Sequence, residues 1–276
     1  MRPTLISIGI FEFHAYAVAL ALAFLVGVLL PIRENYRREK PYPATPMAGL
    51  WVFLGAMLGA RVYWILQYDT WRHLHRALFV WQGGLVFYGG LIGGTLGCIA
   101  YLKYHKIPLL PVGDIALPYV PLAHAIGRVG CFLNGCCWGA PTGLPWGVSF
   151  PHSKYGVYAD HLKENLVAPG AAVSLPVHPT QLYEAAGLLA AFVLLKFVYR
   201  RRVHDGVLLP LYLLIYGFLR FTTETFRGDS ARPLGGMTVS QVISLGMMAG
   251  AGILAVTLWA VVWRHGPAED AERGSL

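Results

Sequence analysis

The sequence predicts an all-α, polytopic membrane protein with seven transmembrane helices, on the evidence of its composition and its apolar windows. Of the 276 residues, 56% are hydrophobic and only 13% are charged, whereas a soluble domain has about 25% charged residues. Seven apolar windows come close to the roughly 20 residues that a helix needs to cross a bilayer. They lie at about 14–32, 47–67, 84–102, 112–133, 180–199, 207–226 and 239–262.

The first window is expected to remain in the protein as a helix. It is longer than the apolar core of a signal peptide, and no clear cleavage site made of small residues follows it.

The distribution of basic residues predicts the orientation. With the N-terminus outside, twelve Lys and Arg residues fall in inner loops, seven fall in outer segments, and three fall within or at the ends of spans. Because cytoplasmic loops are enriched in Lys and Arg, this bias predicts an outside N-terminus and a cytoplasmic C-terminus. The same bias, with attraction to anionic lipids, explains the net charge of +8 without a nucleic-acid partner. The twelve are Arg33, Arg37, Arg38, Lys40, Lys103, Lys106, Lys196, Arg200, Arg201, Arg202, Arg264 and Arg273.

The chain is expected to form a single transmembrane domain over residues 1–276, with two larger connections. A basic arm with several prolines, at about 33–46, is expected along the cytoplasmic surface. The connection at about 134–179 is rich in aromatic and turn-forming residues and has no helical periodicity. Since Trp and Tyr are favoured at the membrane surface, we expect a small periplasmic head there, with a simple interfacial loop as the alternative.

Two arginines within the apolar spans are the strongest functional signal. Arg128 lies in the glycine-rich stretch 124–139, at the end of the fourth span, and Arg220 lies inside the sixth span. A guanidinium at membrane depth costs roughly 3 to more than 10 kcal/mol, so it normally has an anionic partner or a functional cavity. Because its planar fork pairs with phosphate in a bidentate manner, two such cations aimed at one cavity indicate a phosphate ligand.

The sixth helix is predicted to have one polar and charged face. Four side chains follow the spacing i, i+4, i+8 and i+11, which at about 100° per residue places them on one side. In the functional interpretation, Glu224 orients Arg220 towards a ligand. In the structural alternative, these two residues form only an ion pair that holds the helices together. The four are Tyr216, Arg220, Glu224 and Arg227.

Glycines and a helix start add two further polar candidates. The third window opens with many glycines over residues 83–94, which allows close helix packing in lipid and gives Tyr88 room to project into a cavity. His178 stands before Pro179 and Thr180, which mark the start of the fifth helix. His178 is therefore either an interfacial residue at a helix end or part of a polar rim on the same cavity.

The four cysteines form a single residue and a cluster. Cys98 stands alone in a span and is expected to be a small core residue. Cys131, Cys136 and Cys137 lie near the outer face, where an oxidising compartment permits disulfides. Their C-x4-C-C spacing is not a standard zinc or iron–sulfur pattern, so neither a metal nor a cofactor is predicted. His124 is a candidate base for a nucleophilic cysteine, although a lone helix histidine is more often structural.

Six short motifs follow one another along the chain. They are Phe13-His14-Ala15-Tyr16 in the first helix, Gly59-Ala60-Arg61 in the second, GGLVFYGG at 83–90, GRVGCFLNGCCWG at 127–139, HPTQLYE at 178–184, and Tyr216 with RFTTETFR at 220–227. In combination they are highly specific, and together they resemble the prolipoprotein diacylglyceryl transferase family. The family has seven transmembrane helices and an outside N-terminus, which agrees with the distribution of basic residues.

The resemblance implies transfer of a diacylglyceryl group from phosphatidylglycerol to the lipobox cysteine of bacterial prolipoproteins, with release of glycerol phosphate. It implies a multi-pass protein of the bacterial cytoplasmic (inner) membrane, whose partners are phosphatidylglycerol, prolipoprotein signal peptides and membrane lipids. The family's two essential arginines match Arg128 and Arg220, and its important tyrosines match Tyr16 and Tyr216. Its glutamate in the sixth helix matches Glu224, and its signature glycine matches Gly139. The expected catalytic residues are Arg128, Arg220, Tyr88 and Glu224, and the expected substrate-binding residues are Tyr16, Arg128, Asn134, Gly139, His178, Tyr216 and Arg220.

Three positions depart from the better-known members of the family, which have asparagine at Cys131, glutamate at Cys136 and histidine at Tyr88. The first two departures leave the ligand role of the turn's side chains open, and the third removes a residue sometimes assigned as general base. The incoming thiol must lose its proton. Candidate acceptors are Tyr88, Glu224, His178 and the leaving phosphate.

Two other classes of protein share some of these features. A transporter of anionic solutes also keeps arginines inside the membrane, but its usual internal repeats are not evident in the sequence. A membrane thiol or metal protein would instead be centred on the cluster of Cys131, Cys136 and Cys137.

Overall fold

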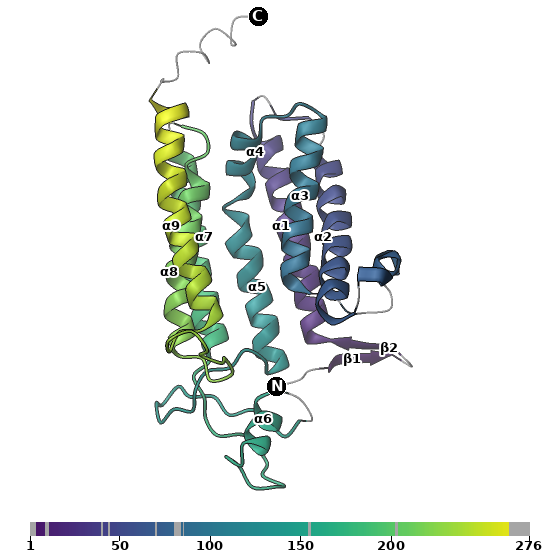
Figure 1. The fold of residues 1–276 in the computed structure, drawn as a ribbon, viewed down its shortest axis with the longest axis vertical. Helices are drawn as coiled ribbons and strands as arrows, with labels where there is room; N and C mark the ends of the chain where they lie inside the picture. Colours follow the sequence, from purple (N-terminus) through teal and green to yellow (C-terminus); the bar gives the residue numbers. More distant parts are fainter. Residues whose placement is uncertain are drawn as a thin grey trace, which may run out of the picture. The chain divides into compact units, whose positions relative to one another are not determined.

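The computed structural model describes residues 4–8, 11–39, 41–43, 45–69, 71–79, 84, 86–153, 156–201 and 204–264, and most of them are helical (Figure 1). The chain divides into two compact units. One contains Met1–Gly27 and Ala116–Leu276, and the other is Val28–Ile115. The phosphate-site candidates Arg128 and Arg220 both belong to the first unit, so their geometry can be described within it.

Among the residues that the structure describes, five segments are long and apolar enough to cross a membrane, which confirms a helical, polytopic membrane protein. These segments are Ala15–Tyr36, Pro46–Tyr68, Leu109–Asn134, Thr180–Arg201 and Val239–Trp263. Two further helices, α3 (Phe87–Tyr104) and α8 (Leu208–Thr225), each have 18 residues. The helix α8 falls within the predicted window 207–226, and α3 extends two residues beyond the end of the window 84–102.

The start of the chain differs from the all-α prediction. An antiparallel hairpin of β1 (Thr4–Ile8) and β2 (Phe11–His14) precedes α1, which begins at Ala15 and ends at Tyr36. Phe13 and His14 therefore belong to a strand and not to the first helix. The sequence of β2 alternates apolar and polar residues, and that of β1 is rich in β-branched residues, both typical of strands.

The fourth predicted span is interrupted. It consists of α4 (Leu109–Ala116) and α5 (Tyr119–Asn134) in place of one continuous helix over 112–133. Pro118 stands directly before α5 and Pro121 lies in its first turn. Because proline lacks an N–H donor and crowds the preceding turn, these prolines favour a new helix start over a continued helix.

In the unit Val28–Ile115, α2 (Thr45–Tyr68) packs closely against α3. A methyl group added at Gly93 would overlap the carbonyl oxygen of Gly55, and one added at Gly89 would overlap that of Gly59. The glycines thus allow the two backbones to touch, as predicted for close packing in lipid. The helix α3 begins at Phe87, three residues later than the predicted window.

In the other unit, α5 packs against α7 (Thr180–Arg201), α7 against α8, and α8 against α9 (Val239–Leu258) (Figure 1). A π-helical turn, Trp259–Trp263, continues α9. Thr238 caps α9 in a capping box with Gln241, which satisfies donors at the helix start. The first part of α1 also contacts α5, where a methyl group at Gly130 would lie 2.7 Å from the Cβ of Ala19.

The described part of the connection at 134–179, called the head below, contains an apolar cluster of buried residues. Its apolar core consists of Trp138, Phe150, Val157 and Val177. The head contains a helix, α6 (Val157–Lys163), that periodicity did not predict. Seven residues span only about two turns, too few for a recognisable amphipathic pattern. Gly156 precedes α6 with a φ of 77°, a backbone conformation that favours glycine.

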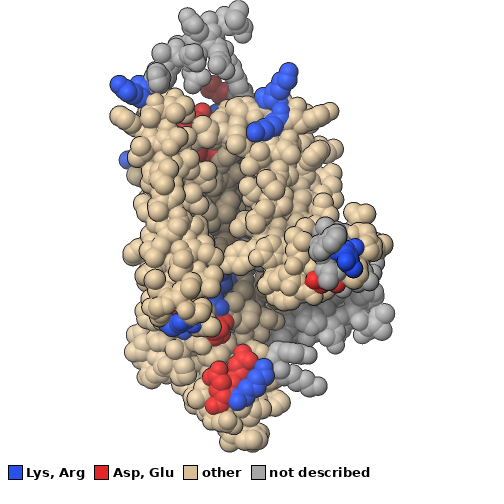
Figure 2. Space-filling view, in the orientation of Figure 1, with Lys and Arg blue, Asp and Glu red and all other residues tan. Residues whose placement is uncertain are grey.

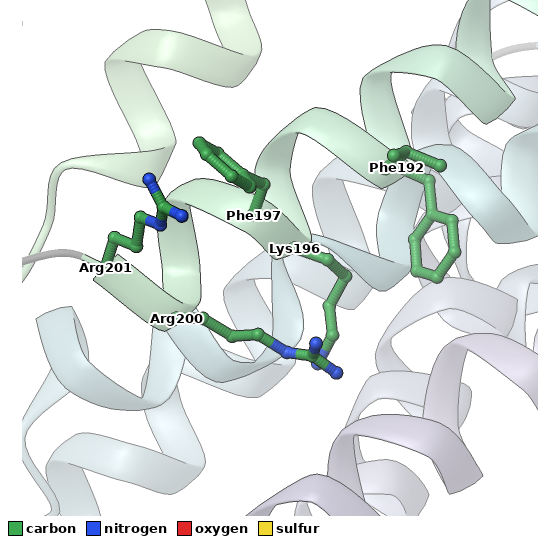
Figure 3. Close-up of a pocket in the computed structure, with 6 residues that line it drawn as sticks. Phe192, Lys196, Phe197, Arg200 and Arg201 are labelled. Carbon is green, nitrogen blue, oxygen red and sulfur yellow. The ribbon is translucent and has the colours of Figure 1, made fainter.

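Charged side chains are scarce over the middle of the helices on the face drawn in Figure 2 and gather near helix ends. At the end of α7, a groove with a volume of about 490 Å³ has aromatic and basic walls (Figure 3). Its basic residues lie at least about 24 Å along α7 from the helix start, so the groove is separate from the arginine site described below. The lining residues are Phe192, Val193, Lys196, Phe197, Arg200 and Arg201.

The contact between α2 and α3 can be tested with two adjacent glycines. Gly93→Ala should lower the free energy of unfolding by about 1–3 kcal/mol, the usual cost of overpacking, because its methyl group would meet the backbone of Gly55. Gly94→Ala is the matched control, since its methyl group would lie 3.4 Å from Ala56 and Val52. Thermal unfolding in detergent would measure both, and equal melting temperatures would contradict the close packing.

Candidate functional site

One buried carboxylate, that of Glu184, lies between the two predicted arginines. Its Oε1 lies 2.9 Å from Nη2 of Arg128, and its Oε2 lies 3.2 Å from Nη1 of Arg220. The three side chains come from different helices, because Arg128 is on α5, Glu184 on α7 and Arg220 on α8. The structure therefore brings Arg128 and Arg220 together, as the phosphate-site prediction required.

Arg220 has two further partners. Its Nη2 lies 2.8 Å from Oε2 of Glu224, one turn along α8, and donates a hydrogen bond of 3.1 Å to the hydroxyl of Ser240 on α9. The i, i+4 ion pair predicted from the sequence is therefore present. Glu224 also lies 3.9 Å from Nε of Arg227, so its carboxylate faces two cations.

Arg128 has a second partner on its own helix. Its Nε donates a hydrogen bond of 3.2 Å to Nε2 of His124, which requires an unprotonated Nε2. The His124 ring contacts the ring of Tyr216 at a centroid distance of 5.4 Å, and Tyr216 stacks on Tyr212 at 5.9 Å. Aromatic rings thus form one wall beside the guanidinium groups.

The two arginine side chains are more exposed than the two carboxylates of this cluster. The side chains of Arg128 and Arg220 are 14% and 13% exposed, whereas those of Glu184 and Glu224 are 4% and 1% exposed. Glu184 Oε1 and Glu224 Oε2 accept no aligned hydrogen bond from the described residues, despite the short ion-pair distances. The aligned hydrogen bond among these contacts runs from Nη1 of Arg220 to Oε2 of Glu184.

The turn that follows α5 is held by the first residues of α7. The hydroxyl of Thr180 donates to the carbonyl of Cys137 at 2.8 Å, and the amide of Gln181 donates to the carbonyl of Cys136 at 2.7 Å. Gly135 and Cys137 have φ values of 76° and 61°, a conformation that costs a non-glycine residue energy. The two hydrogen bonds stabilise this backbone beside the arginine cluster.

Gly139 lies where two segments meet. Its N–H donates to the carbonyl of His178 at 3.0 Å, and it forms a β-bridge with Arg227. A methyl group at this position would lie 2.5 Å from the His178 carbonyl and 2.9 Å from that of Phe226. A larger residue would clash with these two carbonyl oxygens. Glycine therefore allows the backbone at residue 139 to approach both segments.

His178 belongs to an aromatic cluster at the start of α7. Its Nδ1 lies 3.2 Å from the hydroxyl of Tyr183, which also accepts a hydrogen bond of 2.8 Å from the indole N–H of Trp146. The ring of Phe226 contacts the His178 ring at 5.4 Å. His178 therefore connects the head to α7 and α8, and it has no direct contact with Arg128 or Arg220 among the interactions found for the described residues.

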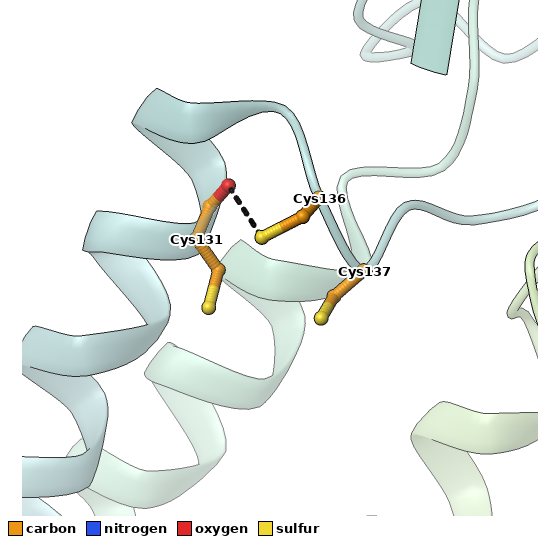
Figure 4. Close-up of side chains that lie close together, drawn as sticks. All are labelled: Cys131, Cys136 and Cys137. Atoms are coloured by element: carbon orange, nitrogen blue, oxygen red, sulfur yellow. Dashed lines mark hydrogen bonds between the residues drawn. The ribbon is translucent and has the colours of Figure 1, made fainter. Parts of the chain in front are cut away.

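The thiols of Cys131, Cys136 and Cys137 lie together at the end of α5 (Figure 4), with their three sulfur atoms all within 4.8 Å of one another. All are free cysteines. Hydrogen bonds from the two neighbouring thiols, with the positive charge of Arg227, lower the pKa of Cys137. This cluster is the group in the described chain whose geometry suits a metal ion.

The remaining predicted residues have various surroundings. Tyr16, in the first turn of α1, is 40% exposed and lies against Gly130 of α5. Asn134 is exposed at the last position of α5. Tyr88, on α3, is 50% exposed and belongs to the other unit.

Sequence reasoning missed two residues of the site. The sequence predicts no role for Glu184, which lies within the motif HPTQLYE, or for Ser240. The signal that pointed to Glu184 was its acidic side chain within an apolar span, four residues after Thr180. The sequence predicts His124 as a candidate base for a cysteine, whereas in the structure its ring accepts a hydrogen bond from Arg128.

These features define the class: a polytopic membrane protein in which two arginines from different helices share a buried carboxylate. Residues 3–257 match the sequence profile of the family described as prolipoprotein diacylglyceryl transferase. The chain therefore belongs to this family.

Several curated relatives cover nearly the whole chain. The chain is 34% identical to the phosphatidylglycerol–prolipoprotein diacylglyceryl transferase of Ruegeria pomeroyi, over 95% of each protein. It is 35% identical to the protein of the same name from Verminephrobacter eiseniae, over 99% of this chain and 96% of the relative. With that from Trichormus variabilis, identity is 33% over 88% of this chain and 84% of the relative.

The close approach of Gly139 to the carbonyls of His178 and Phe226 can be tested directly. Gly139→Ala should destabilise the protein by about 1–3 kcal/mol or more, because the new methyl group would push against the carbonyls of His178 and Phe226. Gly143→Ala is the control, since a methyl group there would meet no atom within 4 Å. The measurement is the melting temperature in detergent. A Gly139→Ala protein as stable as the control would refute the close approach.

Proposed function

We propose that this protein transfers the diacylglyceryl group of phosphatidylglycerol to the lipobox cysteine thiol of prolipoproteins and releases glycerol phosphate. The membership of the family and the names of the curated relatives support this function. The observation that supports its chemistry is the pair of partly exposed arginine side chains, Arg128 and Arg220, held by the buried carboxylate of Glu184.

The arginine pair suits a phosphodiester. Glu184 and Glu224 offset the charges of the two arginines in a dry environment, where an unpaired cation would be costly. A lipid phosphate brings acceptor oxygens to the open side, where arginine donors remain. Since guanidinium groups bind phosphate with two parallel N–H bonds, Arg128 and Arg220 are the substrate-binding groups of this proposal, with Tyr16 and Tyr216 nearby on α1 and α8.

The reaction forms one bond and breaks one. The sulfur of the incoming cysteine attacks the glyceryl carbon that bears the phosphate, a C–S bond forms, and the C–O bond of that ester breaks. Its electron pair goes to the phosphate oxygen, so negative charge grows on the leaving glycerol phosphate. Preorganised cations act where charge develops, and this is the catalytic role that we assign to Arg128 and Arg220.

The leaving phosphate is the group that we assign as final acceptor of the thiol proton. Glu224 is committed to Arg220 and Arg227, and His178 to Tyr183. Nε2 of His124 already accepts a hydrogen bond from Arg128. A phosphate monoester has a second pKa near 6, so the newly formed dianion can receive the thiol proton and then release it to water at neutral pH. Glu224 then acts by orienting Arg220.

The proposal includes seven spans, an outside N-terminus and a location in the bacterial cytoplasmic membrane. The 18-residue helices α3 and α8 extend about 27 Å at 1.5 Å per residue, close to the roughly 30 Å of a hydrocarbon core. Basic residues collect at the end of α7, at Lys196, Arg200 and Arg201. The head and the arginine site lie towards the opposite end of α7, which is the outer side in this orientation.

Conservative substitution of the two arginines tests the phosphate site. Arg128→Lys and Arg220→Lys each retain the charge but lose the forked geometry. Removal of one preorganised donor typically costs about 2.7–4 kcal/mol, or roughly a hundred- to a thousandfold in rate. In each variant, the rate of transfer from phosphatidylglycerol to a lipobox peptide should fall by about a hundred- to a thousandfold. A gel-shift assay with purified protein measures this rate.

A double substitution separates this function from a structural ion pair. If Arg220 only neutralises Glu224, then Arg220→Gln with Glu224→Leu should restore folding and transfer together. The phosphate-site proposal expects the double variant to fold without regaining transfer. Transfer near the parental rate would show that Arg220 only supports the helix packing.

The orientation is tested with reporter fusions. A reporter fused after Arg202 should be cytoplasmic, because the basic residues at the end of α7 favour that side. A reporter inserted between residues 150 and 165, in the head, should be outside. Detection of both reporters on the same side would rule out the seven-span topology with an outside N-terminus.

A further inference from the structure

We propose that Cys131, Cys136 and Cys137 form a binding site for a soft, thiophilic metal ion, with univalent copper as its best fit. The three sulfur atoms lie within 4.8 Å of one another, and their side chains are half-buried. Figure 4 shows the side chains turned towards a common space at the end of α5. Neither the family membership nor the transfer reaction calls for such a site.

The sulfur positions are close to those of a thiolate complex. Metal–sulfur bonds of about 2.3 Å with angles of 109–120° would separate the sulfurs by roughly 3.8–4.0 Å. The observed separations, at most 4.8 Å, need to shrink by less than about 1 Å. Rotation of the cysteine side chains about χ1 can supply this movement without a change in the backbone.

The backbone explains why spacing alone pointed to no metal. The C-x4-C-C pattern spans the end of a helix and a reversed turn, in which the N–H of Cys136 donates to the carbonyl of Cys131 at 3.2 Å. Gln181 and Thr180 hold the carbonyls of Cys136 and Cys137. The three thiols are therefore preorganised by contacts that the ligand spacing does not reveal.

The number and softness of the ligands favour copper in its univalent state. Thiolates select copper(I), zinc and iron–sulfur clusters. Structural zinc and iron–sulfur clusters use four protein ligands, whereas the group found among the described His, Cys, Asp and Glu residues has three members. Three thiolates with one univalent cation carry two negative charges. The positive charges of Arg227 and Arg128, which both act on Cys137, would offset them.

The test is a copper(I) titration of the full-length, reduced protein in detergent under anaerobic conditions, against a colorimetric copper(I) chelator. We expect one copper per chain to be retained. Loss of one ligand should cost more than the roughly 10–100-fold that loss of an outer-shell partner costs. Cys131→Ser, Cys136→Ser and Cys137→Ser should each weaken binding by at least that factor, and Cys98→Ser is the matched control that should bind as the parent does.

Two outcomes of the titration would overturn the proposal. In the first, the parent protein releases its copper at the same chelator concentration as the triple Cys131→Ser, Cys136→Ser, Cys137→Ser variant does. In the second, the parent protein contains bound zinc, and added copper(I) does not displace it.

X-ray absorption at the copper edge of the loaded parent needs no variant. Three sulfur ligands at about 2.2–2.3 Å are expected, and a nitrogen or oxygen shell would contradict the site. Diacylglyceryl transfer to a lipobox peptide is measured separately, on metal-free samples of the parent and of the triple variant. Because the accepting thiol comes from the substrate, the triple variant should keep transfer while it loses copper, so failure of this site and failure of the transferase proposal are distinguishable.

Discussion

The carboxylate of Glu184 is the constraint on which the site depends. Arginines are costly at membrane depth unless they are paired, and this chain has Arg128 on α5 and Arg220 on α8 facing one another. Glu184, on α7 between them, offers one oxygen to each, at 2.9 and 3.2 Å. Without it, two like charges would lie close together in a largely buried environment. With it, both guanidinium groups are held in one place, and their side chains stay partly exposed, at 14% and 13%.

The rest of this unit can be understood as support for that arrangement. The packing of α5 against α7 and of α7 against α8 brings the three side chains together. The start of α7 also holds the turn after α5, through Thr180 and Gln181. Gly139 then lets this turn approach the segment before α7 without a steric clash. A single helix, α7, thus supplies the shared carboxylate and fixes the backbone next to it.

Much of this could be predicted from sequence, because hydropathy and helical spacing are local properties. Six apolar windows each overlap one helix, the fourth overlaps both α4 and α5, and the i, i+4 spacing predicted the pair of Arg220 and Glu224. The bridge by Glu184 could not be predicted, since it depends on the rotation of α7 relative to α5 and α8. The same holds for the cysteine cluster, which is created by a turn that folds back. The hairpin before Ala15 and the interruption at Pro118 do have local sequence signals, namely strand-forming residues and prolines. A hydropathy window of about 20 residues averages over such short features.

The most direct test of this account is the steady-state kinetics of Glu184→Gln. Glutamine keeps the shape of the side chain but removes the charge that orients both arginines, while it also removes an anion that competes with the lipid phosphate. We therefore predict that kcat falls about a hundredfold or more, the scale of losing a preorganised donor, whereas KM for phosphatidylglycerol stays the same or decreases. A folded Glu184→Gln protein with parental kcat, or one that differs only by a higher KM, would contradict the claim that Glu184 positions Arg128 and Arg220 for catalysis.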